Sequence, residues 1–199
     1  MSAWTPHLSE GDVIPNVLFK MRVTVGKVAQ NPLDWKNAYT HDLFKNKRCA
    51  LFSIPGAFTP TCSGSHLPSY EKLYEDIKKH NIDEVYCLSV NDAFVMRKWG
   101  LDQGLEEDNT VGALHNFKKI KLIPDGACLF TKGMGMNCTW TSERGFGERS
   151  WRYSCVVNNM KIEKMFVEQP FKNNSEDDPY EVSDADTMLK YLSKKQNKT

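Results

Sequence analysis

This sequence of 199 residues lacks the features that mark several large classes of protein. No apolar stretch approaches the length of a membrane-spanning helix, and residues 1–16 do not have the pattern of a secretory or transit peptide. Charge is almost balanced, with 26 Lys and Arg against 25 Asp and Glu. This balance gives no reason to expect nucleic acid or an anionic membrane as a partner.

The six cysteines do not form a metal site or a dithiol motif. No two of them have the CxxC spacing of a zinc knuckle or a redox pair, and the five histidines show no grouping typical of metal ligands. We therefore predict no metal, haem or flavin cofactor, and a reducing compartment, the cytosol. A chain of this length can bury a core without disulfides. We predict one domain over residues 1–199, with a flexible tail after about residue 193.

One cysteine stands where a strand is expected to end and a helix to begin. Residues 48–54 form a mostly apolar run of strand length, which Pro55 and Gly56 break. After Cys62, apolar residues recur at helical spacing between residues 67 and 77. A thiol in the first turn of a helix faces unpaired N–H groups and the positive end of the helix dipole, and both favour the nucleophilic thiolate. Cys62 is therefore the candidate nucleophile.

The stretch PGAFTPTCS at residues 55–63 resembles the active-site pattern of peroxiredoxins. Within that family it is similar to the type II, or atypical fifth-class, branch and to the peroxiredoxin part of peroxiredoxin–glutaredoxin hybrids. Three further segments resemble the same branch: residues 84–96, 147–154 and 178–192. The resemblance implies an α/β protein with a thioredoxin-like fold, in which helices flank a central mixed sheet. It also implies a thiol-specific peroxidase that needs no cofactor, only an external thiol as co-substrate.

The resemblance gives roles to four residues of the site. Cys62 would attack one peroxide oxygen and become a sulfenic acid. The hydroxyl of Thr59 would hold the peroxide in line with the sulfur, and Pro55 would shape the pocket and shield the sulfur from water. Arg152 would favour the thiolate and stabilise charge as the O–O bond breaks. Arg149 would either support this arginine or form a surface ion pair.

Two residues near the candidate nucleophile have competing interpretations. Cys87 follows Cys62 by 25 residues, like the second cysteine of plant-like type II peroxiredoxins, and this similarity implies a resolving thiol. Its position within an apolar strand indicates an inert packing residue, which we favour. Residues 178–183, where some relatives carry a resolving cysteine, have none, so a one-cysteine cycle is favoured. His66 is expected to be partly exposed near the pocket and not to act as a base.

The implied activity is the reduction of hydrogen peroxide and small organic hydroperoxides, which serves antioxidant defence and redox homeostasis. The sulfenic acid would be reduced by glutathione with glutaredoxin, or by thioredoxin. We favour glutaredoxin acting in trans, because the chain is similar to the hybrids. The resemblance also implies a non-covalent homodimer through the face that bears the Cys62 loop.

The alternative to a peroxidase is a redox sensor or holdase switched by Cys62 oxidation. Thr59 and Arg152 disfavour it, because a sensor needs no in-line geometry.

The remaining pattern predicts the elements around this loop. Strands are expected over residues 13–23, 48–54, 84–90, 118–123, 151–157 and 160–167, and the last two are expected to form a hairpin with its turn at Asn158 and Asn159. Residues 26–47 are expected to be irregular, with Leu43 and Phe44 anchored in the core. Asn91 and Asp92 are expected to cap a helix, and Ser183 to cap the last one. The other four cysteines are expected to pack in the core or to have no role: Cys49, Cys128, Cys138 and Cys155.

Overall fold

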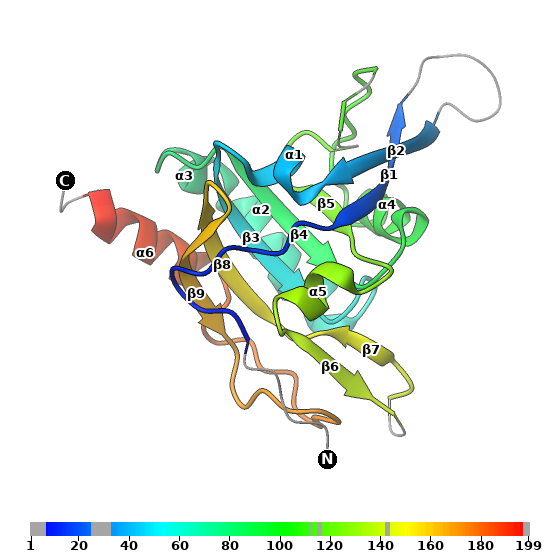
Figure 1. The fold of residues 1–199 in the computed structure, drawn as a ribbon, viewed down its shortest axis with the longest axis vertical. Coiled ribbons are helices and arrows are strands. Elements are labelled where there is room, and N and C mark those ends of the chain that lie inside the picture. Colours follow the sequence, from blue (N-terminus) through cyan, green and yellow to red (C-terminus); the bar gives the residue numbers. More distant parts are fainter. Residues whose placement is uncertain (1–6, 25–32, 112, 115–116, 142–143, 197–199) are drawn as a thin grey trace.

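A five-stranded mixed sheet forms the centre of the computed structural model (Figure 1). Its strands lie in the spatial order β5 (Lys121–Pro124), β4 (Glu84–Ser89), β3 (Arg48–Ile54), β8 (Tyr153–Asn158) and β9 (Lys161–Val167). The three strands β3, β4 and β5 run parallel, whereas β8 and β9 are antiparallel to their neighbours. The structure describes residues 7–24, 33–111, 113–114, 117–141 and 144–196.

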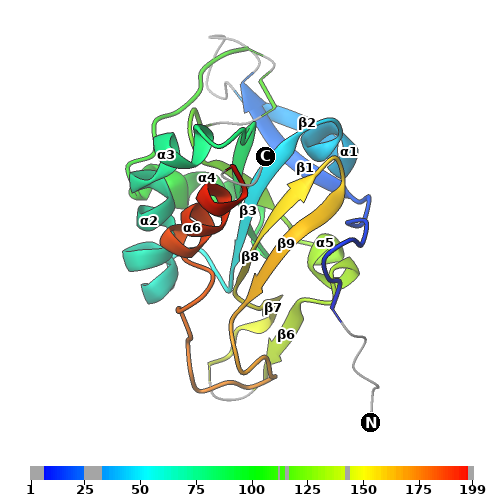
Figure 2. The ribbon, with the colours of Figure 1, turned by 90° about the vertical axis from the view of Figure 1, so that its left-hand side faces the viewer.

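Both faces of this sheet are covered, as Figure 2 shows. One face carries α2 (Leu67–Lys72), α3 (Tyr74–Lys78), α4 (Ala93–Asp102) and α6 (Ala185–Gln196). The other carries α1 (Thr40–Phe44), α5 (Leu129–Gly133) and the hairpin of β1 (Leu18–Thr24) and β2 (Leu33–Tyr39). A second hairpin, β6 (Asn137–Trp140) and β7 (Gly147–Ser150), extends beyond the sheet. Within the described residues, no helix is long and apolar enough to cross a membrane.

The continuous apolar run of β3 follows from this coverage. Side chains alternate between the two faces of a strand, so Leu51 packs in one core and Phe52 in the other. The same alternation separates Tyr86 from Val85 in β4. The central sheet flanked by helices is the architecture that the sequence predicted.

Several local predictions are confirmed. Strand β3 has the predicted bounds, and Asp92 caps α4 by accepting hydrogen bonds from the N–H groups of Phe94 (2.8 Å) and Val95 (2.9 Å). The turn between β8 and β9 contains Asn159 at a φ of 47°, a left-handed conformation that asparagine tolerates. Four strands begin later than predicted: β1 at Leu18, β5 at Lys121, β8 at Tyr153 and β9 at Lys161.

The prediction of an irregular segment over residues 26–47 is wrong for its second half. Residues 33–39 form β2, which pairs antiparallel with β1, and α1 follows directly. This hairpin exposes much of β2 to solvent, so its polar sequence resembled a loop. Leu43 and Phe44 are completely buried, as expected. Residues 25–32 lie outside the described part of the chain.

The predicted N-cap of the last helix is also wrong by one residue. Helix α6 begins at Ala185, and Asp184 caps it by accepting a hydrogen bond from the Thr187 N–H at 2.8 Å. The hydroxyl of Ser183 donates to the Glu168 carboxylate at 2.7 Å. Serine and aspartate are comparable caps. Because the Ser183 hydroxyl binds the buried carboxylate of Glu168, Asp184 caps the helix instead.

An ion-pair cluster at the far end of β9 predicts a pH dependence of stability. The Glu163 carboxylate accepts hydrogen bonds from Arg48 Nη2 (2.5 Å) and Nε (3.0 Å) and pairs with Lys195 Nζ at 2.9 Å. Burial opposes its charge, but these partners lower the pKa of Glu163 to about 2. Because its folded pKa lies below the unfolded value, the carboxylate stabilises the protein above about pH 4.5, and this contribution is lost as the pH falls towards about 2.

Replacing Glu163 by Gln is therefore expected to lower the free energy of unfolding by about 1–3 kcal/mol at neutral pH, and by less in acid. Urea unfolding of both proteins at about pH 6 and about pH 3 measures the difference. A difference that is the same at both pH values would contradict the assigned role of Glu163.

Candidate active site

The loop after β3 places Cys62 in the first turn of a helix, as the sequence predicted. Pro60 and Thr61 are already helical, and the π-helical turn η1 (Cys62–His66) follows and continues into α2. The Ser63 N–H donates to the Thr59 carbonyl at 3.0 Å and closes the first turn. The Cys62 side chain is completely buried. The sulfur therefore has no surface exposed to solvent in this conformation.

Asn91, two residues after the end of β4, holds the loop in place. Its Oδ1 atom accepts hydrogen bonds from the Ala57 N–H (3.0 Å) and from the Ser89 hydroxyl (2.7 Å). The carboxyl ends of the parallel strands β3 and β4 meet at one edge of the sheet, which brings this side chain to the loop. The sequence pattern predicted only a helix-capping role for Asn91.

Close packing within the loop fixes Thr59. Its hydroxyl donates to the Gly56 carbonyl at 2.8 Å, so the oxygen lone pairs remain available to accept a hydrogen bond from a bound molecule. A Cβ atom on Gly56 would lie 3.1 Å from Arg149 Nη1 and 3.3 Å from Thr59 Cγ2, which leaves little room for a side chain there. Arg149 therefore packs against the loop, and Pro55 is buried at its start.

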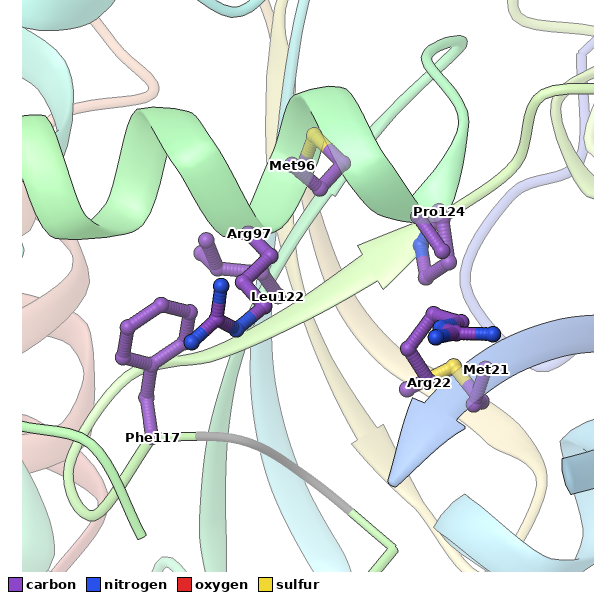
Figure 3. A pocket seen from close by; sticks show the side chains of 8 residues that line it. Met21, Arg22, Met96, Arg97, Phe117, Leu122 and Pro124 are labelled. Atoms are coloured by element: carbon purple, nitrogen blue, oxygen red, sulfur yellow. The ribbon is translucent and has the colours of Figure 1, made fainter. Parts of the chain in front are cut away.

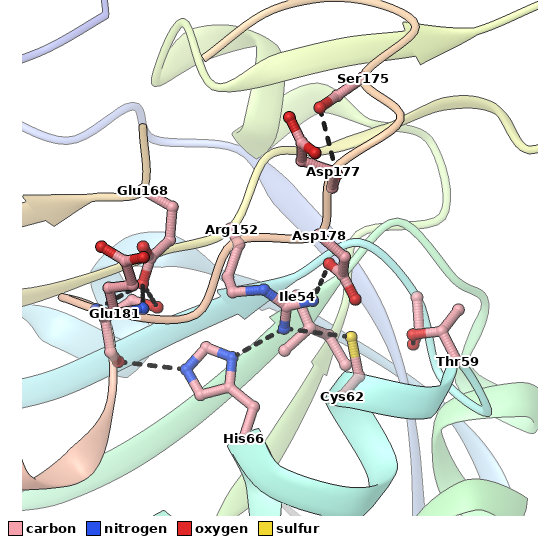
Figure 4. Close-up of polar contacts among 12 residues, drawn as sticks. Ile54, Thr59, Cys62, His66, Arg152, Glu168, Ser175, Asp177, Asp178 and Glu181 are labelled. Carbon is pink, nitrogen blue, oxygen red and sulfur yellow. Dashed lines mark hydrogen bonds and ion pairs between the residues drawn. The ribbon is translucent and has the colours of Figure 1, made fainter. Parts of the chain in front are cut away.

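Arg152 lies directly against the cysteine (Figure 4). Its side chain is 1% exposed, and its Nη1 atom lies 3.4 Å from the Cys62 sulfur. Its Nη2 atom pairs with the carboxylate of Asp178. Burial opposes the charge of Arg152, but the negative charges of Cys62 and Asp178 raise the pKa of the guanidinium above its ordinary value. The arginine is therefore a fixed positive charge beside the sulfur.

Sheet topology explains how two residues 90 positions apart meet. Strand β8 pairs antiparallel with β3, and Ser53 lies opposite Tyr153. Arg152 immediately precedes β8 and therefore sits beside the end of β3, where the Cys62 loop starts. The structure thus brings together the predicted pair of Cys62 and Arg152.

Two neighbours of Arg152 were missed or misjudged in the sequence. Asp178 lies in the segment between β9 and α6, and a single acid in a polar segment carries no sign of its distant partner. His66 was predicted to be partly exposed, but it is completely buried. The prediction failed because Tyr180 and Ser183, from the same segment, contact its ring. Burial lowers the pKa of His66 well below its usual range, and the charge of Arg152 lowers it further.

The other cysteines have the surroundings of packing residues. Cys87 is completely buried in β4, and its pKa is raised well above the ordinary value by burial and further by Cys62 nearby. Burial is also the main reason that the pKa values of Cys49 and Cys128 rise to about 12. All six cysteines are free thiols in this structure. These surroundings disfavour thiolate formation at the three positions.

A hollow in the protein lies between β1, α4 and β5 (Figure 3). It is lined by Met21, Arg22, Ala93, Met96, Arg97, Phe117, Leu122 and Pro124. Arg97 pairs with Glu107 at 2.5 Å. The lining has no nucleophile and does not include Cys62 or Arg152, so the chemistry is assigned to the buried cysteine.

The fold and the site together define a class. A cysteine in the first turn of a helix and a buried arginine in contact with its sulfur are the parts of a thiol peroxidase, in which a thiolate attacks and a cation stabilises the developing charge. They lie on a mixed sheet with helices on both faces, at the carboxyl end of a parallel strand.

Comparisons with known proteins agree with this class. A model of the Redoxin family matches residues 10–189. Peroxiredoxin sll1621 of Synechocystis sp. is 50% identical over 180 residues, which are 90% of this chain and 88% of that protein. Hybrid peroxiredoxin hyPrx5 of Haemophilus influenzae is 45% identical over 92% of this chain and 66% of its own length. The crystal structure of the Plasmodium falciparum antioxidant protein (1-Cys peroxiredoxin) has a TM-score of 0.80 and 35% identity, over 93% of this chain and 99% of that chain.

The chain belongs to the Redoxin family, as one of its peroxiredoxins with a thioredoxin-like fold. Its activity is that of a thiol peroxidase, as the sequence resemblance implied.

The position of Thr59 predicts how two substitutions at this residue will differ. Thr59→Ser keeps the hydroxyl and is expected to retain the peroxide rate constant within about fivefold, whereas Thr59→Val is expected to lower it about 100-fold. Stopped-flow consumption of hydrogen peroxide with excess dithiothreitol measures both. Circular dichroism melting curves control for stability, and a Thr59→Val protein with the wild-type rate would rule out a catalytic hydroxyl.

Proposed function

We propose that this peroxiredoxin reduces hydrogen peroxide and small organic hydroperoxides through a sulfenic acid at Cys62. The contact of 3.4 Å between its sulfur and Arg152 carries the proposal. The thiolate attacks one peroxide oxygen, and an S–O bond forms as the O–O bond breaks. Sulfur is oxidised to the sulfenic acid, and the second oxygen leaves with a proton as water or an alcohol. The fixed charge of Arg152 stabilises the departing oxygen.

Two further residues of the loop serve this step. The Thr59 hydroxyl donates to the Gly56 carbonyl, so it receives the peroxide O–H as an acceptor and aligns the substrate with the sulfur. Pro55 is buried and offers no polar side chain, so it keeps water away from the thiolate. Arg149 supports the loop through its packing against Gly56.

The catalytic cycle uses one cysteine of this chain. Cys87 is completely buried within β4 and acts in packing, since a disulfide with Cys62 would require the sheet and the helix start to open together. One thiol forms a mixed disulfide with Cys62 and releases water, and a second thiol releases the Cys62 thiol. The likeness to the Plasmodium falciparum 1-Cys peroxiredoxin supports this cycle.

Glutathione with glutaredoxin is the proposed reductant, with thioredoxin as the alternative. The sequence resemblance to peroxiredoxin–glutaredoxin hybrids supports this choice, as does the match to 66% of hybrid peroxiredoxin hyPrx5. Six free cysteines fit a reducing compartment, and we place the activity in the cytosol as antioxidant defence.

Intact mass analysis tests the one-cysteine cycle. After one equivalent of hydrogen peroxide with dimedone present, we expect the dimedone adduct on Cys62 in the wild type and in Cys87→Ser alike. A mass loss of about two hydrogens in the wild type that is absent from the variant would make Cys87 a resolving thiol.

The choice of reductant is tested by peroxide turnover, measured once with glutathione and glutaredoxin and once with thioredoxin and its reductase. Faster turnover with thioredoxin would show that thioredoxin, and not glutathione with glutaredoxin, is the reductant. No reaction at Cys62 would overturn the peroxidase mechanism.

A non-covalent homodimer through the face with the Cys62 loop is also proposed. Four large apolar side chains are exposed near this edge of the sheet: Trp35 (49%), Phe58 (52%), Phe94 (59%) and Leu129 (50%). Three of them follow the carboxyl ends of the parallel strands, which meet at one edge. The fourth, Trp35, packs edge-on against Phe94, with 5.4 Å between the ring centroids. A second copy of this chain would cover this surface.

A charge placed on this surface is expected to separate the dimer. Phe94→Glu should elute as a monomer in size-exclusion chromatography with light scattering, because it buries a carboxylate between two apolar faces. Val13→Glu is the matched control, since Val13 is 58% exposed beside β9, at the opposite edge of the sheet. It should remain a dimer. A monomeric wild type, or a Phe94→Glu dimer, would contradict the proposed interface.

A further inference from the structure

His66 lies one helical turn after the nucleophile and is completely buried. Three aromatic rings surround its imidazole: Phe52 and Tyr180, each with 4.9 Å between ring centroids, and Tyr70 at 5.7 Å. A histidine enclosed in this way must satisfy both ring nitrogens with protein partners, because burying an unpaired polar group is costly.

The two partners of the ring determine which nitrogen carries the proton. The Nε2 atom lies 3.2 Å from the Ser183 carbonyl oxygen, and an oxygen of this kind can only accept. The Nδ1 atom lies 3.2 Å from Arg152 Nη1, and a guanidinium can only donate. Nε2 therefore carries the hydrogen, and Nδ1 is the acceptor. Burial and the charge of Arg152 both lower the pKa of His66, in agreement with a neutral ring.

One nitrogen of Arg152 thus serves two acceptors. Nη1 donates one hydrogen to the Cys62 sulfur and the other to His66 Nδ1, while Nη2 faces Asp178 (Figure 4). Because the guanidinium is planar, a partner that fixes Nη1 also fixes the direction of its second hydrogen. A neutral acceptor achieves this without cancelling the charge that the thiolate and the peroxide need. A second carboxylate in its place would compete with the thiolate for the cation.

The other end of the imidazole is itself fixed. The Ser183 carbonyl also accepts a hydrogen bond from the Tyr70 hydroxyl at 3.0 Å. The Ser183 N–H and hydroxyl donate to the buried carboxylate of Glu168, at 2.8 Å and 2.7 Å. The Glu168 N–H donates to the Arg152 carbonyl at 3.2 Å, so the chain of contacts returns to the arginine. His66 therefore spans two fixed points.

We propose that His66 is a positioning residue: its Nδ1 atom accepts the second Nη1 hydrogen of Arg152 and so aims the first at the Cys62 sulfur. This inference rests on the proposed role of Cys62 as the peroxide-reactive thiol. It assigns the histidine no proton transfer and no contact with the substrate.

Two variants test the hydrogen bond. His66→Leu removes the acceptor, whereas His66→Asn places an oxygen at the position of Nδ1 and keeps it. We expect His66→Leu to lower the rate constant for hydrogen peroxide about tenfold, and to raise the midpoint of the pH profile for Cys62 alkylation by iodoacetamide by about one pH unit. His66→Asn should recover most of both losses. Equal losses in both folded variants, or wild-type behaviour of His66→Leu, would overturn the proposal.

Alkylation involves no peroxide, so its result is separate from that of the proposed peroxidase mechanism. If His66→Leu alters alkylation and neither protein reduces peroxide, only the proposed function fails. If peroxide reduction is normal and His66→Leu changes nothing, only the positioning role fails.

A measurement on the unmodified protein remains decisive if a variant does not fold. In ¹⁵N-labelled wild type, two-bond ¹H–¹⁵N spectra of the imidazole groups report the protonated nitrogen. We expect one ring to remain neutral, with its proton on Nε2, from about pH 5 to about pH 8. Nuclear Overhauser contacts with the rings of Phe52, Tyr70 and Tyr180 assign this ring to His66. A proton on Nδ1, or titration in this range, would overturn the proposal.

Discussion

A buried arginine is the constraint on which the rest of this site depends. The Arg152 guanidinium is almost completely removed from water, and a charge in that position is stable only with close partners of good geometry. The partners are the Cys62 sulfur, the Asp178 carboxylate and the His66 ring. Cys62 and His66 come from a helix start, and Asp178 comes from the segment before α6. Stabilising the charge of Arg152 therefore requires these two distant segments to pack together at the start of β8.

A second buried charge, of opposite sign, fixes that closing segment. One oxygen of Glu168 accepts four hydrogen bonds, from the N–H groups of Glu181, Val182 and Ser183 and from the Ser183 hydroxyl. Such a carboxylate has little freedom to move, because every change of position breaks several bonds. The loop that carries Asp178 and the Ser183 carbonyl is therefore anchored beside the arginine. The two buried charges explain why the active site is closed.

A closed site has a consequence for the catalytic cycle. The sulfur of Cys62 has no surface exposed to solvent in this conformation, so a peroxide needs some opening of its surroundings and a larger thiol reductant needs more. In the proposed cycle, reduction of the sulfenic acid by a thiol therefore depends on a local opening at the first helical turn. The π-helical turn at Cys62–His66 is a departure from regular helix geometry at this place.

The sequence alone determined the local features: strand β3, the break at Pro55 and Gly56, the cysteine in the first helical turn and the Asp92 cap. Each depends on neighbours within a few residues, and a resemblance in the motif added Arg152. Only the tertiary structure decided that His66 is buried, that Asp178 faces the arginine, and that Asp184 caps α6 in place of Ser183. Helical periodicity shows which face of a helix can be covered. The segment that covers His66 lies more than 100 residues later in the chain. Its position is set by the buried charges of Arg152 and Glu168.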